Sequence, residues 1–153
     1  MLHKQPRSTA SLSDEYETPV SLYLELCEKY HITPELDVAA DYSNSKAPYW
    51  YYKEDSALNK IWDMDVWCNP PHTLTKEFAR YADQQWSDND INILMIVPAN
   101  SICAKYFDDI FEKNHATYHR INGRPTFLEN GRPCEKPARN SYFAVVWREG
   151  QRC

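Results

Sequence analysis

The stretch Ile91-Asn92-Ile93-Leu94-Met95-Ile96-Val97 decides the fold of this chain. Apolar residues stand at odd and at even positions of the run, so a strand formed here would bury both of its faces. Such strands are typical of the centre of a parallel sheet that helices cover on either side. We therefore expect a central β-strand at residues 91–97 and an α/β architecture around it.

Further strand candidates lie on both sides of this run in the sequence. They are residues 36–40, 49–52 and 65–68 before it, and a weak strand at 117–121 and a final strand at 141–148 after it. Between the last two lies a stretch, residues 122–140, that contains three of the ten prolines and two of the three glycines. We expect this stretch to be irregular.

Helices are expected to alternate with the strands. Thr18-Pro19 is a helix start, with the Thr18 hydroxyl at the N-cap, and a second helix starts at Thr73 or Thr75. Ser101 can cap a third helix, whose buried side would contain Cys103, Phe107, Ile110 and Phe111. Strands alternating with helices, followed by a final strand pair, predict a three-layer α/β sandwich with a mostly parallel sheet and an antiparallel C-terminal strand.

Length and composition favour one folded domain. The chain has 153 residues, of which 42% are apolar and 25% are charged, which argues against disordered and coiled-coil proteins. We expect residues 1–16 to form a flexible tail and residues 17–153 a single domain. No run of 18 apolar residues and no apolar N-terminal stretch is present, so a soluble cytoplasmic protein is expected.

Glycine and cysteine usage excludes several kinds of site. The three glycines are Gly123, Gly131 and Gly150, so a Walker A loop and a G-x-G-x-x-G fingerprint are both absent. The five cysteines are odd in number and contain no C-x-x-C pair, which argues against a disulfide framework and a structural zinc site. Buried thiols are the expected state.

Charge is unevenly distributed along the chain. Residues 1–113 hold 10 Lys and Arg against 19 Asp and Glu, a net of −9, whereas residues 114–153 hold 7 against 3, a net of +4. The tract from 119 to 139 would attract a nucleic-acid backbone, although a solvated loop is the commoner use of such a tract. Its basic residues are His119, Arg120, Arg124, Arg132, Lys136 and Arg139.

In open α/β sheets, ligands bind beyond the carboxyl ends of the strands. This rule singles out Asp37 in the first strand and the corner Asn69-Pro70-Pro71-His72 after a later one. An exocyclic adenine amine is a poor nucleophile, and two acceptors, the Asn69 side-chain oxygen and the Pro70 carbonyl, would turn its lone pair toward a methyl donor. The prolines hold that carbonyl rigid, and a planar side chain at residue 72 can stack on a base that has left its duplex. The alternative is a strand-ending proline turn in which Asn69 only caps the next helix.

These motifs, in this order, resemble the phage-type Dam family of DNA N6-adenine methyltransferases over residues 16–147. The matching segments are Glu17-Thr18-Pro19, Leu36-Asp37-Val38-Ala39-Ala40, Asn44 with Lys46, Asp55-Ser56-Ala57-Leu58 with Trp62, Trp67-Cys68-Asn69-Pro70-Pro71, Val97-Pro98-Ala99, and Gly123-Arg124 with Phe127. The resemblance implies a Rossmann-like class I methyltransferase fold, S-adenosylmethionine as methyl donor, and an adenine flipped out of DNA as acceptor. It also implies a role in modifying phage or mobile-element DNA within a prokaryotic cell or an infected host.

The resemblance assigns roles by position. Asn69, Pro70, Pro71 and His72 would form the catalytic corner. Thr18 and Pro19 would lie beside the methionine end of the cofactor, Asp37, Val38 and Ala39 would form its first-strand contact, and Asp55 would hold its ribose or adenine. The alternatives are that Asp37 caps a helix from the end of a strand and that Asp55 is an ordinary helix N-cap.

Two features depart from the family pattern. His72 stands where the family usually has tyrosine or phenylalanine, and an imidazole is a smaller stacking surface that can charge at mildly acid pH. The chain also has no separate target-recognition domain, so contacts to phosphate or guanine would come from Arg120, Arg124, Arg132 and Arg139. A monomer and a homodimer both fit the sequence.

Three functions stay open on the sequence. The first is DNA adenine-N6 methylation, the second is methylation of RNA or of a protein amide by the same corner, and the third is nucleic-acid binding by a catalytically impaired methyltransferase fold. The place after the first strand, where enzymes of this fold usually have a glycine-rich turn, here reads Ala39-Ala40-Asp41-Tyr42-Ser43-Asn44.

Overall fold

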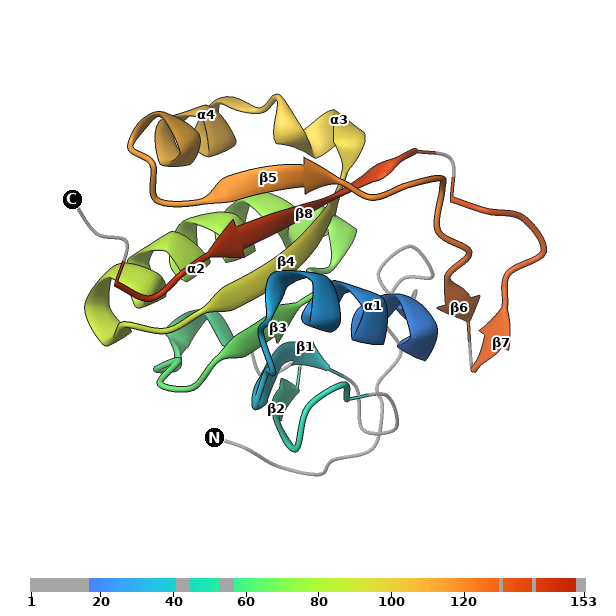
Figure 1. Ribbon diagram of the computed structural model, residues 1–153, viewed down its shortest axis with the longest axis horizontal. Helices are drawn as coiled ribbons and strands as arrows, with labels where there is room; N and C mark the ends of the chain where they lie inside the picture. Colours follow the sequence, from blue (N-terminus) through green and yellow to red (C-terminus); the bar gives the residue numbers. More distant parts are fainter. Residues whose placement is uncertain (1–16, 41–44, 53–56, 130, 139, 151–153) are drawn as a thin grey trace.

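A computed structural model of the chain describes residues 17–40, 45–52, 57–129, 131–138 and 140–150 (Figure 1). Its centre is a six-stranded sheet in the order β2-β1-β3-β4-β8-β5. The strands are β1 (Leu36–Ala40), β2 (Tyr49–Tyr52), β3 (Val66–Cys68), β4 (Ile93–Pro98), β5 (Thr117–Arg120) and β8 (Tyr142–Trp147). A separate two-stranded ladder joins β6 (Leu128–Glu129) and β7 (Arg132–Pro133).

The predicted central strand is confirmed. Strand β4 lies inside the sheet, paired in parallel with β3 and antiparallel with β8. Residues Ile93–Val97 are all buried because their side chains enter the hydrophobic cores on the two faces of the sheet. Strands β2, β1, β3 and β4 run in parallel, and β8 runs against both β4 and β5. The sheet is therefore mostly parallel with an antiparallel C-terminal strand, as predicted.

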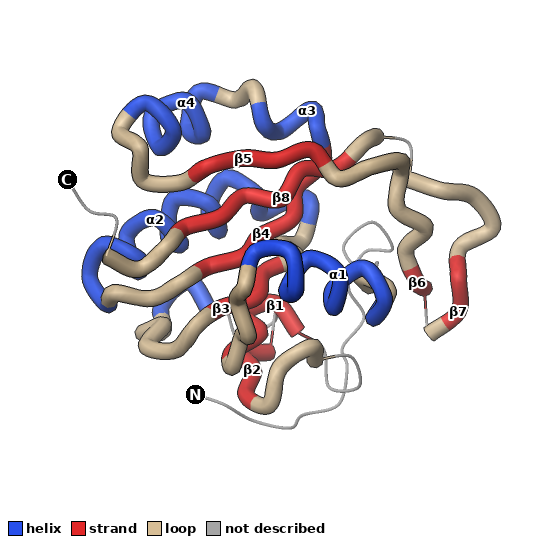
Figure 2. Tube along the Cα trace, in the orientation of Figure 1, coloured by secondary structure: helices blue, strands red, loops and turns tan. Residues whose placement is uncertain are grey.

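Helices cover both faces of the sheet, and Figure 2 shows α1 in front of it and α2 behind it. On one face, α1 (Val20–Tyr30) buries Tyr23, Leu26 and Tyr30. On the other, α2 (Thr75–Asn89) and α4 (Lys105–Glu112) pack against the sheet, with α3 (Ala99–Ile102) directly after β4. Short 3₁₀ turns, η3 (Ala57–Asn59) and η4 (His72–Leu74), lie in the connections. This arrangement is compatible with a Rossmann-like fold.

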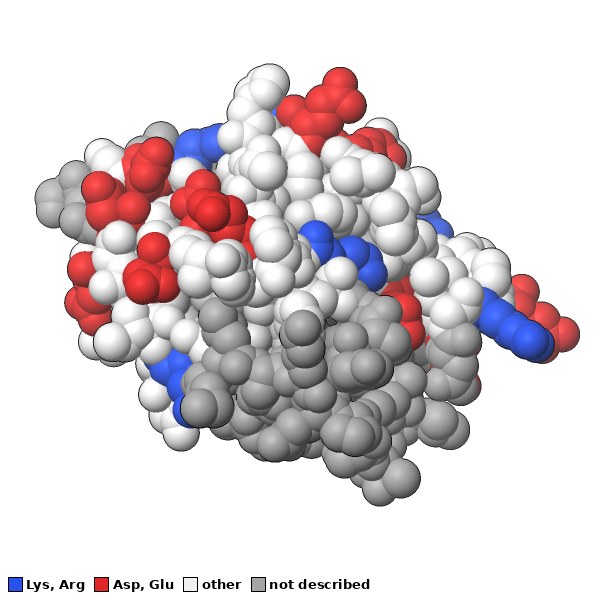
Figure 3. All heavy atoms as spheres, turned by 90° about the horizontal axis from the view of Figure 1, so that it is seen from below, with Lys and Arg blue, Asp and Glu red and all other residues white. Residues whose placement is uncertain are grey.

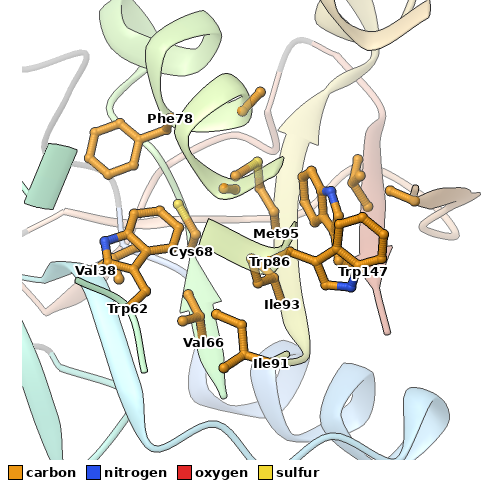
Figure 4. Close-up of a cluster of buried hydrophobic side chains, with 14 of the residues drawn as sticks. Val38, Trp62, Val66, Cys68, Phe78, Trp86, Ile91, Ile93, Met95 and Trp147 are labelled. Carbon is orange, nitrogen blue, oxygen red and sulfur yellow. The ribbon is translucent and has the colours of Figure 1, made fainter. Parts of the chain in front are cut away.

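Large aromatic side chains fill the core between the sheet and α2. Trp62, Trp86 and Trp147 are each at most 1% exposed, and Figure 4 shows them around aliphatic and sulfur-containing side chains of β3 and β4. The Trp62 indole nitrogen donates to the Ala57 carbonyl at 3.0 Å, and the Trp86 indole nitrogen donates to the Arg148 carbonyl at 2.7 Å. These bonds satisfy the polar atoms of residues that are otherwise buried.

Several local predictions were wrong. Thr18 does not cap α1, whose N-cap is Pro19 without a side-chain cap bond. Ser101 lies inside α3, and α4 begins after Ala104, because the chain turns at residues 103–104 instead of continuing as one helix. The described part of the stretch 122–140 is irregular, as expected, apart from the short β6–β7 ladder, where Gly131 adopts the left-handed φ of 78° that favours glycine.

Among the four cysteines in the described part of the chain, the expectation of buried thiols is correct for Cys68 alone, and Cys153 lies outside the described residues. Cys27 and Cys134 are half-buried and Cys103 is exposed, and these four cysteines are free. Cys103 is exposed because it follows the end of α3 and faces away from the core that Phe107 and Ile110 enter. Within the described ranges, no helix has both the length and the apolar character needed to cross a membrane.

Candidate active site

The corner Asn69-Pro70-Pro71-His72 leaves the sheet at the carboxyl end of β3. Pro70 and Pro71 are buried, Asn69 is half-buried and His72 is exposed. Since β1, β3 and β4 are adjacent and parallel, the corner lies at the edge of the sheet where the ends of these strands meet. The predicted position of the corner is thus confirmed.

The side chain of Asn69 is oriented by a residue that is distant in sequence. Its Nδ2 lies 3.1 Å from the Thr18 Oγ1 and donates to it, and Thr18 is only 2% exposed. Because the amide is planar, this contact turns the Asn69 Oδ1 away from Thr18. The Thr18 hydroxyl, which the sequence assigned to a helix cap, instead positions the Asn69 amide.

Backbone bonds close the corner after the two prolines. The Leu74 N–H donates to the Pro71 carbonyl at 2.8 Å, and the Thr75 hydroxyl donates to the His72 carbonyl at 3.2 Å. Neither η4 nor α2 has a side-chain cap, and their N-cap residues are Pro71 and Leu74. The alternative in which Asn69 only caps the next helix is therefore wrong.

Asp37 is a buried carboxyl group in the neighbouring strand β1. It is 4% exposed, and its two oxygens accept from the backbone N–H groups of Ala39, at 3.2 Å, and Lys46, at 3.0 Å. Burial raises the pKa of Asp37 to about 6, although these hydrogen bonds and the Lys46 charge lower it. Asp37 therefore holds the backbone of Lys46 beside β1, and it does not cap a helix.

The other residues assigned to the cofactor lie in different surroundings. Pro19 is half-buried at the start of α1, and Ala39 is half-buried in β1. The Val38 side chain is fully buried in the hydrophobic core on the α2 side, so it contributes to packing. Asp55 lies outside the described residues.

His72 faces the buried aromatic residue Tyr142. Its Nε2 lies 2.9 Å from the Tyr142 hydroxyl oxygen, and the two ring centroids are 6.3 Å apart at an angle of 39°. The Tyr142 ring packs edge-on against Phe127, with centroids 4.8 Å apart. His72, Tyr142 and Phe127 therefore form a row of three aromatic rings that starts at the corner.

These three residues line a pocket of about 450 Å³. The polar residues that also line it are Asn100, Ser101, Asn140 and Lys136. This volume lies within the range of small-molecule sites, about 300–1,000 Å³. The pocket thus offers aromatic faces and hydrogen-bonding groups beside the Asn-Pro-Pro-His corner, a combination that suits a planar, polar ring.

Sequence reasoning missed Tyr142 and Asn100. Tyr142 reaches the corner only because β8 pairs antiparallel with β4 in a register that sets Tyr142 opposite Pro98, at the carboxyl end of β4. Asn100 follows that same end in α3. Tyr142 is the aromatic residue at the first position of the last strand, and this position was the available signal. It indicates a site residue only once the strand order is known.

The arginines predicted to contact DNA are exposed but do not form a uniformly basic surface. Arg120 ends β5, Arg124 lies in the following turn, and Arg132 is in β7, opposite Glu129. In Figure 3, acidic side chains gather on the left, and the right end, where Figure 1 places β6 and β7, carries both signs of charge. Arg139 lies outside the described residues.

Comparison with known proteins agrees with this geometry. Residues 5–152 match the family described as DNA N-6-adenine-methyltransferase (Dam). The chain belongs to the Dam family. A DNA N-6-adenine-methyltransferase of Escherichia phage T1 is 31% identical over 107 residues, which are 67% of this chain and 43% of that relative. The chain therefore spans less than half the length of this Dam relative.

Proposed function

We propose that this chain transfers the methyl group of S-adenosylmethionine to the N6 amino group of adenine in DNA. Membership of the Dam family supports the reaction. We also propose that residues 17–153 form one class I methyltransferase domain. The observation that carries the proposal is the Asn69-Pro70-Pro71-His72 corner at the carboxyl end of β3, with the Asn69 amide turned by Thr18.

The corner would act by holding the two N–H bonds of the amine. The Asn69 Oδ1 and the Pro70 carbonyl accept one N–H each, which draws the nitrogen toward tetrahedral geometry and frees its lone pair from the ring. The donor supplies an electrophilic methyl carbon on its sulfonium sulfur. When the nitrogen bonds to this carbon, the carbon–sulfur bond breaks and the amine becomes cationic. The amine then releases a proton to water, so no strong base is needed.

The residues near β1 fit the proposed cofactor. Asp37 is a buried carboxylate, and its two oxygens accept hydrogen bonds from the backbone N–H groups of Ala39 and Lys46. A buried carboxylate gains most from a ligand that brings a positive charge or hydroxyl donors, and S-adenosylmethionine has an ammonium group and ribose hydroxyls. We assign Asp37 to one of these groups, with Thr18, Pro19, Ala39, Asp55 and the backbone of Val38 as further contacts.

DNA would reach the pocket by flipping the target adenine out of the duplex, where His72 stacks on it. Exposed Arg120, Arg124 and Arg132, together with Arg139, would contact the phosphates or base edges nearby. The same proposal places the protein in the cytoplasm of a prokaryotic cell or an infected host.

Transfer of labelled methyl groups to DNA, RNA and protein tests the function directly. We expect label in DNA alone, recovered as N6-methyladenine after digestion to nucleosides. Asn69→Ala should lower kcat by about a hundredfold or more, as for the loss of one transition-state hydrogen-bonding group. Label in RNA or protein instead, or full activity of Asn69→Ala, would overturn the proposal, and S-adenosylmethionine binding without transfer would indicate an impaired methyltransferase.

A further inference from the structure

We infer that Tyr142 is a positioning residue for His72 and thereby sets the DNA affinity of the pocket. The inference rests on the proposed function. It starts from the contact between the His72 Nε2 and the Tyr142 hydroxyl, 2.9 Å apart.

Tyr142 is the rigid member of this pair. It is 3% exposed, its backbone carbonyl accepts from the Ile121 N–H at 2.9 Å, and it lies opposite Pro98 in the β4–β8 ladder. Phe127 packs against its ring at 4.8 Å. A tyrosine held in this way presents its hydroxyl at one place.

His72 is the exposed member of this pair, and it belongs to a three-residue 3₁₀ turn. A hydrogen bond at Nε2 lies in the plane of the ring. It therefore fixes the direction in which the ring faces point without using either face, and a stacked base needs a ring face.

The tyrosine hydroxyl can serve His72 in every protonation state. It donates when Nε2 carries no proton and accepts when Nε2 is protonated, because a hydroxyl is both donor and acceptor. A phenylalanine at position 142 would preserve the ring packing with Phe127 and remove the hydroxyl that contacts the His72 Nε2. Tyr142→Phe therefore isolates the positioning role.

The experiment is a double-mutant cycle on the full chain, with steady-state methyl transfer to DNA as the readout. We expect Tyr142→Phe to raise KM for DNA by about three- to tenfold, the effect of one lost hydrogen bond, with kcat changed less than twofold. A stacking contact holds the base equally before and during the reaction, so its loss appears in KM. In the His72→Phe background, Tyr142→Phe should change KM less than twofold, because no Nε2 is left to position.

Tyr118→Phe is the matched control. Tyr118 lies in β5 and packs against Phe111 and Phe143, on the α4 side of the sheet, so losing its hydroxyl should leave KM unchanged. Equal effects of Tyr142→Phe in both backgrounds, a loss confined to kcat, or no effect would each overturn the inference. If wild-type protein transfers no methyl group to DNA, the proposed function fails instead.

A second pair of variants covers the case in which Tyr142→Phe does not fold. Glutamine at position 72 places an amide near the position of Nε2, whereas leucine places no polar group there. Binding of DNA that carries 2-aminopurine at the target position should be tighter for His72→Gln than for His72→Leu. Equal affinities of these two variants would overturn the inference.

Discussion

At the scale of single residues, the buried carboxyl group of Asp37 links stability to pH. Burial raises its pKa from 3.8 to about 6, so between these values the folded protein keeps a proton that the unfolded chain releases. The stability from this group is fully present below about pH 3.8 and is lost as the pH rises through 6. At about 1.4 kcal/mol per pKa unit, the loss is about 3 kcal/mol.

Asp37→Asn should lack this part of the pH dependence. The unfolding free energies of the variant and the wild type are measured by urea titration of the free protein at pH 4.5 and pH 7.5. Between these pH values, we expect the variant to gain about 1–3 kcal/mol of stability relative to the wild type. The affinity of the wild type for S-adenosylmethionine should change in the opposite direction and increase as the pH rises through 6. Parallel stability curves for the two proteins would contradict the argument.

Thr18 is the second residue whose role can be measured alone. Thr18→Val keeps the shape of the side chain but removes the oxygen that accepts from the Asn69 Nδ2. Because that bond orients the Asn69 amide, we expect kcat for methyl transfer to fall by about three- to tenfold. Thr18→Ser is the control, since it keeps the hydroxyl and should restore most of kcat. Equal kcat values for the valine and serine variants would contradict a role in orientation.

At the scale of elements, local sequence patterns were sufficient to predict a helix or strand wherever its own residues determine its structure. The apolar run of β4 and the alternating elements around it were predicted close to their bounds, because burial on both faces leaves a strong signal. The helix N-caps predicted at Ser101 and Thr18 were wrong, because serine and threonine also occur inside helices and in contacts with distant side chains. Ser101 lies in α3, and the Thr18 hydroxyl contacts Asn69, 51 residues away in the sequence.

A small polar network joins elements that are distant in sequence. Asp83 of α2 accepts from the Trp147 indole nitrogen of β8 at 3.1 Å and lies 3.1 Å from the His115 Nδ1. Asp83→Ala leaves both groups without this acceptor in a half-buried site, so we expect a loss of about 1–3 kcal/mol in unfolding free energy, measured in urea. Methyl transfer should be unaffected, because Trp147 is at the opposite end of β8 from Tyr142.

Asp109→Ala is the control for this network. Asp109 pairs with Lys105 across one turn of α4 at 3.6 Å, with both side chains more than half exposed. Exposed pairs of this kind contribute about 0.5 kcal/mol or less. A loss for Asp109→Ala as large as that for Asp83→Ala would show that the network adds nothing beyond a surface charge.

At the scale of the whole molecule, the candidate site combines segments that only the sheet topology brings together. Asn69 and Asp37 could be predicted from the sequence, since each stands in or after a recognisable strand. The pairing of β8 with β4 puts Tyr142 beside His72, which is 70 residues away in the sequence, and no local sequence pattern predicts such a contact. The same topology sets Asn100 and Lys136 around one pocket.

The distribution of charge over the molecule predicts how the proposed DNA substrate would be bound. The net charge is −5, and residues 1–113 carry the acidic excess, so DNA should be attracted mainly by the part from Arg120 onward. Arg120, Arg124 and Arg132 are exposed there. Replacing any one by alanine should weaken DNA binding at all sequences and reduce the slope of log affinity against log salt by about 1, if that arginine contacts a phosphate.

Lys105→Ala provides the comparison, because Lys105 is exposed on α4, outside the part from Arg120 onward. Filter binding between 50 and 200 mM salt should give Lys105→Ala the wild-type slope and each arginine variant a smaller one. An arginine that reads a guanine edge would behave differently, because its loss would weaken binding mainly to the target sequence. If Lys105→Ala reduced the slope as much as the arginine variants, DNA would be held by general charge, and the assignment of these arginines to the DNA interface would fail.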